Sequence, residues 1–224
     1  MAETIKKHDF VEVDYTGKLP DGTLFDTTSE TVALEHHFHA EKTKYGPIII
    51  CVGEHQILPG LDQEIMGKEI GTEYTMTLAP ENAFGKRDIK QLKVIPLNTF
   101  RQHNLAPQPG LQVDVDGERG TVTSVSGGRV IVNLNHPLAG KEVVYTIKVN
   151  RKVTDVQEQL TAFLNATLRI PENKINIELH ENKTTVQLPM ALPASITDAL
   201  IKKIVEVTGV KDLTFAVKEQ KKEA

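Results

Sequence analysis

The sequence contains one cysteine, Cys51, and no tryptophan. With a single cysteine no disulfide forms within the chain, which excludes the class of small disulfide-rich secreted domains and fits a reducing cytoplasm. No apolar run approaches the roughly 20 residues that a membrane-spanning helix needs, and the first ten residues, "MAETIKKHDF", lack the apolar core of a secretion signal. We therefore expect a cytoplasmic protein without a membrane partner.

A positive charge excess is also absent. The net charge is −4 and the isoelectric point is about 6.1, so nothing indicates nucleic acid as a partner. Hydrophobic residues make up 39% and charged residues 25% of the chain, which is typical of globular proteins. A length of 224 residues suits one large domain or two to three small ones.

The first third of the chain has strand and turn signals. Val11, Val13 and Tyr15 alternate with polar residues, which predicts a strand, and "LPDGTLF" predicts the turn of a hairpin. The polar stretch 29–46 predicts a surface loop with at most a short helix, and "PIIICVG" a buried strand. "GLDQEIMG" predicts a short helix with Leu61, Ile65 and Met66 on one side, and "EYTMTLA" another alternating strand.

The pattern changes after "PENAFG". In residues 86–135, "LKVIPLNTF" is expected to be extended and then broken by proline, and "LQVDV", "GTVTSV" and "RVIVNLN" predict three short strands joined by Asp-Gly and Gly-Gly turns. "EVVYTIKVNRKV" then resumes a strand of the earlier kind. The sequence therefore predicts a small β-rich unit inserted into the first domain.

A third composition begins at Thr154. "TDVQEQLTAFLNATL" predicts a helix capped by Thr154, and "SITDALIKKIVEVTG" a second amphipathic helix capped by Ser195 and ended by Gly209. Between them "KINIELH" and "TTVQLP" predict a hairpin around residues 181–183, "VKDLTFAV" follows as a last strand, and "KEQKKEA" predicts a solvated tail. Residues 154–224 thus form an α-β-β-α-β module.

Four motifs, "VDYTGKLPDGTLFDTT", "ILPGLDQEIMG", "APENAFG" and "NHPLAGKEVVYTIKV", resemble in order and spacing the FKBP-type peptidyl-prolyl cis-trans isomerases. The long insertion after "AFG" resembles the SlyD and archaeal long-chain branch. The resemblance implies an α+β fold in which a twisted antiparallel sheet wraps on a short helix. It also implies an isomerase domain of residues 1–85 and 136–153, an insert domain of residues 86–135, and the separate module of residues 154–224.

The resemblance further implies an apolar cleft for a prolyl ring, with no cofactor. In this sequence the catalytic positions of the family fall on Tyr15, Phe25, Asp26, Phe84 and Tyr145, and the substrate-binding positions on Ile48, Ile57, Leu58 and Leu61. Two of these depart from common family members: Leu61 stands where eukaryotic relatives often have tryptophan, and Phe84 lacks the hydroxyl of the usual tyrosine. The loss of that hydroxyl affects the expected ligand affinity more than the expected catalysis.

Four features carry more than one interpretation. His36, His37 and His39 lie close together and are weak candidates for a nickel or zinc site, although a solvated loop is favoured. Cys51 lies in an apolar strand, which favours a buried, inert thiol, and "VSGGRV" is favoured as a hairpin turn over a phosphate loop. The insert also contains three apolar residues, Leu97, Phe100 and Leu105. They form either the core of the insert or an exposed surface that binds unfolded chains.

The resulting hypothesis is a peptidyl-prolyl isomerase and folding chaperone that acts on unfolded or proline-containing polypeptides. The insert replaces the flap of shorter relatives, so we expect it to overhang the pocket. The C-terminal module buries little surface by itself, which predicts a homodimer through this module. The alternatives are a non-catalytic holdase or scaffold and a metal-binding chaperone.

Overall fold

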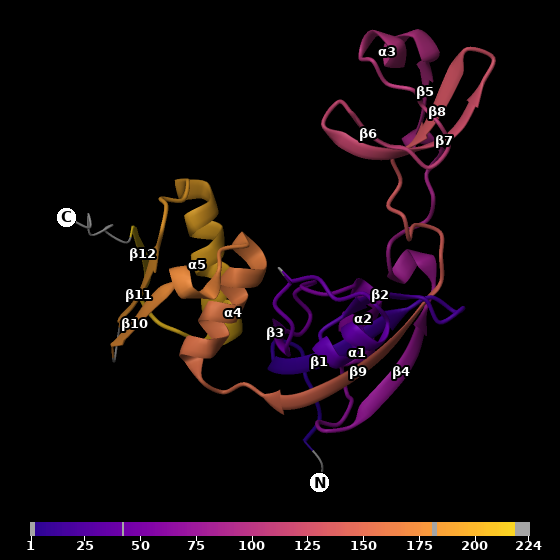
Figure 1. Ribbon diagram of the computed structural model, residues 1–224. Coiled ribbons are helices and arrows are strands. Elements are labelled where there is room, and N and C mark those ends of the chain that lie inside the picture. The colour runs from indigo at the N-terminus through magenta and orange to yellow at the C-terminus, as the bar shows by residue number, and fades with distance from the viewer. Residues whose placement is uncertain (1–2, 42, 181–182, 218–224) are drawn as a thin grey trace. The chain divides into compact units, whose positions relative to one another are not determined.

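The computed structural model describes residues 3–41, 43–180 and 183–217. The chain divides into two compact units, one of Met1–Leu78 with Val143–Ala224 and one of Ala79–Glu142 (Figure 1). The second unit contains the predicted insert, residues 86–135, and extends beyond it on both sides. Part of the predicted turn at 181–183 and the predicted tail after residue 217 lie outside the described residues.

The first unit contains an antiparallel sheet of five strands: β1 (Phe10–Lys18), β2 (Leu24–Thr27), β3 (Ile48–Cys51), β4 (Glu73–Leu78) and β9 (Val143–Lys152). The order is β2-β1-β9-β4, and β3 pairs with the first half of β1, on the same edge as β2. Alternating apolar residues of β1 and β9 bury Val11, Val13, Ile147 and Val149 on one face. The strands predicted around the hairpin and in "EVVYTIKVNRKV" are confirmed.

Two short helices accompany this sheet. Helix α1 (Glu30–Glu35) begins at Ser29, whose side chain accepts a hydrogen bond from the N–H of Val32. Helix α2 (Pro59–Glu64) buries Leu61 and, just past its end, Ile65. The prediction that Met66 shares one side of this helix with Leu61 and Ile65 is wrong. Met66 follows the last helical residue, and it is 39% exposed.

The second unit forms its own four-stranded antiparallel sheet in the order β5-β8-β7-β6. The strands are β5 (Leu92–Pro96), β6 (Gln112–Val115), β7 (Glu118–Ser126) and β8 (Arg129–Asn133), with two short helical turns, η1 (Pro80–Asn82) and η2 (Ile89–Gln91), before β5. The predicted extended segment that is broken by proline is confirmed, because β5 ends at Pro96. Pro96 has the extended backbone of a residue that precedes a helix, and helix α3 (Leu97–Gln102) follows it.

The turn between β7 and β8 is a hairpin, as predicted for "VSGGRV". Gly127 and Gly128 have φ values of 56° and 74°, a backbone conformation that glycine adopts without a steric penalty. Asp116 and Gly117 likewise have positive φ between β6 and β7. These dipeptides set the register of the small sheet.

The C-terminal module has the predicted α-β-β-α-β order: α4 (Val156–Leu168), β10 (Asn176–His180), β11 (Lys183–Leu188), α5 (Ala194–Thr208) and β12 (Leu213–Val217), with a helical turn η3 (Glu172–Lys174) after α4. Strand β11 lies between its neighbours, antiparallel to β10 and parallel to β12. Figure 1 shows α4 and α5 on one side of this sheet.

The two predicted N-terminal helix caps of this module, Thr154 and Ser195, are wrong. The predicted end of the second helix at Gly209 is confirmed. Asp155 caps α4 through a hydrogen bond from the N–H of Glu158, because it stands one residue closer to the first turn than Thr154. Helix α5 begins at Ala194 after Pro193, so Ser195 lies inside the first turn. Gly209 ends α5 in the left-handed conformation.

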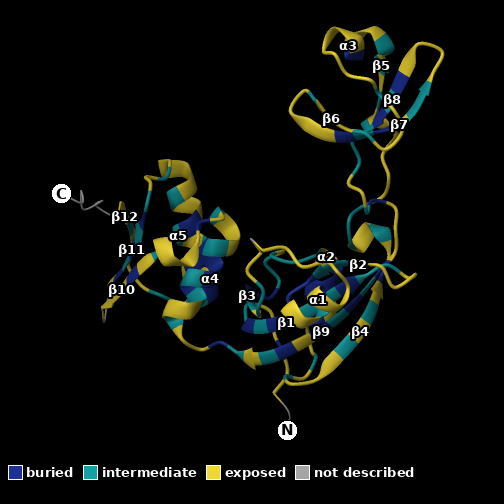
Figure 2. Ribbon diagram, in the orientation of Figure 1, coloured by how far each residue is buried: buried dark blue, intermediate teal, exposed yellow. Residues whose placement is uncertain are grey.

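The module packs on the isomerase sheet through one continuous apolar core. Phe10 of β1, Cys51 of β3 and Val153 join buried residues of the module such as Leu160 and Ile204. Figure 2 shows the buried positions along α4 and α5 and along β1 and β9. Among the described residues, no helix is long and apolar enough to cross a membrane.

Candidate active site

The hairpin of β1 and β2 places the first group of candidate residues. Gly17 pairs with Asp26 and Thr16 with Thr27, with an irregularity after Gly17. The turn closes through the N–H of Gly22, which donates to the carbonyl of Leu19. Gly22 has φ of 87°, a conformation that favours glycine. The turn therefore holds the Phe-Asp pair of β2 opposite the second half of β1.

Tyr15 and Asp26 form a polar pair in a largely apolar setting. The Tyr15 hydroxyl is hydrogen-bonded to the Asp26 carboxylate, and the N–H of Thr27 also donates to that carboxylate. Burial, followed by the negative charge of Asp26, raises the pKa of Tyr15 to about 12. Burial also raises the pKa of Asp26, against the opposing effect of its two hydrogen bonds. Tyr15 is thus a donor at neutral pH.

Tyr145 of β9 joins this pair to Phe25. The ring centroids of Tyr15 and Tyr145 are 5.9 Å apart, and those of Phe25 and Tyr145 are 5.6 Å apart at an edge-to-face angle of 78°. Tyr145 is 2% exposed, and burial raises the pKa of its hydroxyl. Three of the predicted aromatic walls therefore meet around one carboxylate.

The close approach of Phe25 and Tyr145 depends on Gly17, a residue that was not among those predicted from the sequence. A Cβ at Gly17 would lie 2.8 Å from the Phe25 ring and 2.9 Å from the Tyr145 ring. Its φ is not in the left-handed region, so the close approach of the two rings is what favours glycine here. A glycine in the interior of a strand was the available signal, because such a glycine often marks a close approach.

The aliphatic candidates lie on β3 and around α2. Ile48 and Ile57 pack on the same apolar cluster as Tyr15, and Leu61 is 2% exposed. Leu58 is the residue before α2, and its carbonyl accepts from Asp62. Among the described residues its N–H donates to no acceptor of the chain.

Phe84 belongs to the other compact unit. Its ring stacks on His136, with centroids 4.7 Å apart and planes 1° from parallel. The stack joins the start of the insert to the return segment "NHPLAG". The role of Phe84 in the pocket stays a prediction.

The loop histidines point to different partners. The Nε2 of His36 lies 3.2 Å from the Nζ of Lys18, whereas the ring of His39 stacks on Tyr45 and lies 3.4 Å from a Glu30 carboxylate oxygen. His37 has positive φ at the end of α1. Across the described ranges, no group of three or more histidine, cysteine, aspartate or glutamate side chains is arranged to hold a metal ion.

The insert has an apolar groove of its own. A hollow of about 550 Å³ lies between α3 and β6, lined by Phe100, Leu105, Val113 and Val115 among others. The core interpretation holds for two of the three predicted apolar residues, and chain binding by the third stays a prediction. Phe100 is 6% exposed, and Leu97 packs on the same core, whereas Leu105 is 46% exposed.

Comparisons with known proteins place the chain in a family by its sequence. The family pattern described as FKBP-type peptidyl-prolyl cis-trans isomerase matches residues 1–103, and the pattern described as FKBP26, IF domain, matches residues 93–138. A short-type peptidyl-prolyl cis-trans isomerase of Methanocaldococcus jannaschii is 36% identical over 149 residues, which are 66% of this chain and 94% of that protein.

Two bacterial relatives are more distant. The SlyD isomerase of Vibrio cholerae is 26% identical over 65% of this chain and 67% of its own length. The 16 kDa FKBP-type isomerase of Escherichia coli is 27% identical over 66% of this chain and 94% of its own. A solved structure of the three FKBP domains of wheat FKBP73 aligns with 68% of this chain and 42% of that one, at 18% identity and a TM-score of 0.36. On the sequence patterns and the Methanocaldococcus relative, the chain belongs to the FKBP-type peptidyl-prolyl cis-trans isomerases.

Proposed function

We propose that this isomerase rotates X-Pro bonds in the pocket around Tyr15, Phe25, Asp26 and Tyr145, while the insert holds the unfolded client. The observation that carries the first half is the single hydrogen-bonded carboxylate inside a cluster of three aromatic rings. Rotation about an X-Pro bond breaks no covalent bond, so the reaction requires no nucleophile and no acid-base step from this site.

The chemistry follows from amide resonance. The barrier to rotation about a peptide bond is roughly 18–20 kcal/mol because rotation removes the partial double bond. The planar amide is strongly polar, and the twisted amide is less so. An apolar pocket therefore disfavours the planar form relative to the twisted form, and this difference lowers the barrier.

Two polar groups orient the substrate in this scheme. The free N–H of Leu58 donates to a substrate carbonyl next to the proline. Asp26 interacts with the displaced carbonyl carbon, or it fixes the ring of Tyr15 through their hydrogen bond. In either case the ionised carboxylate is the functional form.

The chaperone half of the proposal is supported by apolar side chains on the insert. Ile89 is 83%, Val94 is 60%, Leu105 is 46% and Leu92 is 41% exposed. Three of these lie on or next to β5, an edge strand of the small sheet. An open strand edge beside apolar side chains suits an extended, unfolded chain. A held chain presents its prolines at an effective concentration on the order of mM.

The experiment compares a short and a long substrate. We expect replacement of residues 86–135 by a short glycine-containing loop to leave tetrapeptide isomerisation within a few-fold. Catalysis of a proline-limited protein refolding step should fall about tenfold or more, with weaker suppression of aggregation. Val94→Ser with Leu105→Ser should reproduce the refolding loss, and Thr123→Ser, an exposed residue of β7, should not. Equal losses on both substrates would mean that the insert shapes the pocket.

The alternatives make distinct predictions. A non-catalytic holdase would suppress aggregation without accelerating tetrapeptide isomerisation. A metal-binding chaperone would take up nickel or zinc in a titration and lose this uptake when His36, His37 and His39 are replaced together. A cytoplasmic location remains part of the proposal, because the one cysteine is a buried free thiol.

A further inference from the structure

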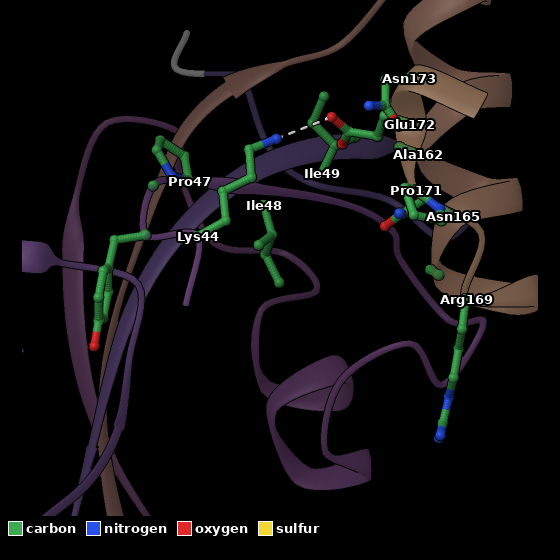
Figure 3. A pocket seen from close by; sticks show the side chains of 13 residues that line it. Lys44, Pro47, Ile48, Ile49, Ala162, Asn165, Arg169, Pro171, Glu172 and Asn173 are labelled. Carbon is green, nitrogen blue, oxygen red and sulfur yellow. Dashed lines mark hydrogen bonds and ion pairs between the residues drawn. The ribbon is translucent and has the colours of Figure 1, made fainter. Parts of the chain in front are cut away.

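We propose that a second client-binding cleft lies between β3 and the C-terminal end of α4, and that it binds an extended polypeptide segment. The cleft has a volume of about 860 Å³, within the roughly 300–1,000 Å³ of typical binding pockets. Figure 3 shows its two walls, the segment Lys44–Ile49 on one side and α4 with the following turn on the other. The inference rests on the proposed function only in taking polypeptides as clients.

The first wall is an open strand edge. Strand β3 pairs with β1 alone among the described strands, so its other edge carries no strand. The N–H of Cys51 points to that edge, because it donates to the side-chain Oε1 of Gln56 at 2.8 Å. Residues two apart in a strand direct their backbone groups to the same edge. The backbone groups of Ile49 therefore face outward as well, and Ile49 lines the cleft.

The second wall leaves room for side chains. Ala162 and Ala166 of α4 face the cleft with single methyl groups, and Pro171 adds an apolar ring without a backbone donor. An extended chain beside Ile49 would gain backbone hydrogen bonds on one side and pack its alternate side chains against the alanines on the other. This combination is the usual mode of recognition by strand addition.

The charges favour a client segment with an acidic residue. Lys44 and Glu172 form an ion pair of 3.1 Å between the two walls (Figure 3), and Arg169 forms no ion pair with any described residue. Lys44 is 87% and Glu172 is 52% exposed in their side chains. Exposed pairs contribute little to stability, so this pair opens readily for a client. A carboxylate on the client then pairs with Arg169 or Lys44.

The cleft adjoins the isomerase pocket through consecutive residues of one strand. Ile49 lines the cleft and packs on the core shared with the module. Ile48 packs on the apolar cluster that also contains Tyr15 and Ile57. Consecutive strand residues point to opposite faces of a sheet, and both Ile48 and Ile49 line the cleft. A chain bound along the edge of β3 therefore lies beside both clusters, and the C-terminal module forms the second wall of its site.

The test uses the full chain and a defined peptide. A fluorescent 12-residue peptide with one proline, two aspartates and alternating valines is titrated by anisotropy, and a photo-crosslinking residue at Asn173 reports contact at the rim of the cleft. We expect crosslinking at Asn173 at least fivefold above that at Lys202, an exposed position of α5. Ala166→Trp, which fills the cleft, should weaken crosslinking at Asn173 at least fivefold. Thr167→Trp, the exposed neighbour on the same helix, should not.

Two further arms complete the test. Replacing both aspartates of the peptide by lysine should also reduce crosslinking at Asn173, as should Arg169→Glu. Equal crosslinking at Asn173 and Lys202, or no effect of Ala166→Trp in a protein with an unchanged Tm, would overturn the proposal. So would a change in native mass on Ala166→Trp, because the cleft would then hold a second copy of this chain. Tetrapeptide isomerisation should be unchanged in all variants, which separates this result from a failure of the prolyl pocket.

Discussion

The hydroxyl of Tyr15 on β1 donates a hydrogen bond to the carboxylate of Asp26 on β2, across the hairpin that joins the two strands. The carboxyl group of Asp26 lies in a partly buried apolar site, and burial raises its pKa. Such an arrangement lowers stability in exchange for function, which is common at active sites. Substitutions in this pair are therefore expected to change both the stability and the activity of the protein.

Asp26→Asn is expected to raise the Tm at pH 7. Because the folded-state pKa of Asp26 is raised, the native state keeps its proton where the unfolded chain has lost it, and stability falls as the pH rises through this window. Asparagine removes that unfavourable contribution and still accepts from Tyr15. The gain should vanish below about pH 3, where aspartate is protonated in both states. Thermal unfolding of both proteins from pH 3 to 8 measures it, and a Tm lowered at pH 7 would contradict the account.

Gly17→Ala is expected to lower both stability and activity. The added Cβ would meet the rings of Phe25 and Tyr145 at 2.8–2.9 Å, and overpacking of this kind costs about 1–3 kcal/mol. Urea unfolding and tetrapeptide isomerisation measure the two effects. With Phe25→Leu added, the stability loss should shrink, whereas the activity should stay low. A Gly17→Ala protein indistinguishable from wild type would mean that the rings are not in contact.

The structure brings together four residues that the sequence motifs had singled out, Tyr15, Phe25, Asp26 and Tyr145, and their roles stay a prediction. Tyr15, Phe25 and Asp26 were identifiable because they stand in a run of family motifs around one tight turn. Gly17 was not, since its importance depends on the rings of Phe25 and Tyr145, which approach it from two other strands. The cap of α4 was misplaced by one residue, because Thr154 and Asp155 are neighbours that can both cap a helix. The cap of α5 was misplaced by two residues, because this helix begins directly after Pro193 without a side-chain cap. The prediction for Met66 was wrong because α2 ends at Glu64, whereas the apolar pattern in the sequence continues to Met66.

Cys51 should report the docking of the C-terminal module. Its thiol is fully buried in the core shared with the module, and burial raises its pKa to about 12. We expect almost no reaction with a disulfide reagent at pH 7.5 in the full chain. Phe163→Ala in α4 should accelerate the reaction roughly tenfold or more, because it loosens this core. Val125→Ala in the insert serves as the control, and fast labelling of the wild type would contradict the burial.

We propose that the full chain forms a homodimer through the C-terminal module. Met190, Val217 and Leu179 of this module are 59%, 53% and 43% exposed, which suits an apolar contact between copies. Light scattering at micromolar concentration should give twice the mass of one chain. Leu179→Asp with Val217→Asp should give the monomer mass, whereas Lys202→Asp should leave the dimer intact. A wild-type monomer at that concentration would remove this proposal.

The central claim is that the pocket around Tyr15 and Asp26 accelerates rotation about X-Pro bonds, and the rate of cis-trans isomerisation of a prolyl tetrapeptide tests it most directly. The account predicts clear acceleration by the full chain. Asp26→Ala and Tyr15→Ala should each lower kcat/KM by about tenfold or more with the fold intact by circular dichroism, while Asp198→Ala on α5 leaves it unchanged. No acceleration by the wild-type protein, or full activity in both pocket variants, would contradict the account.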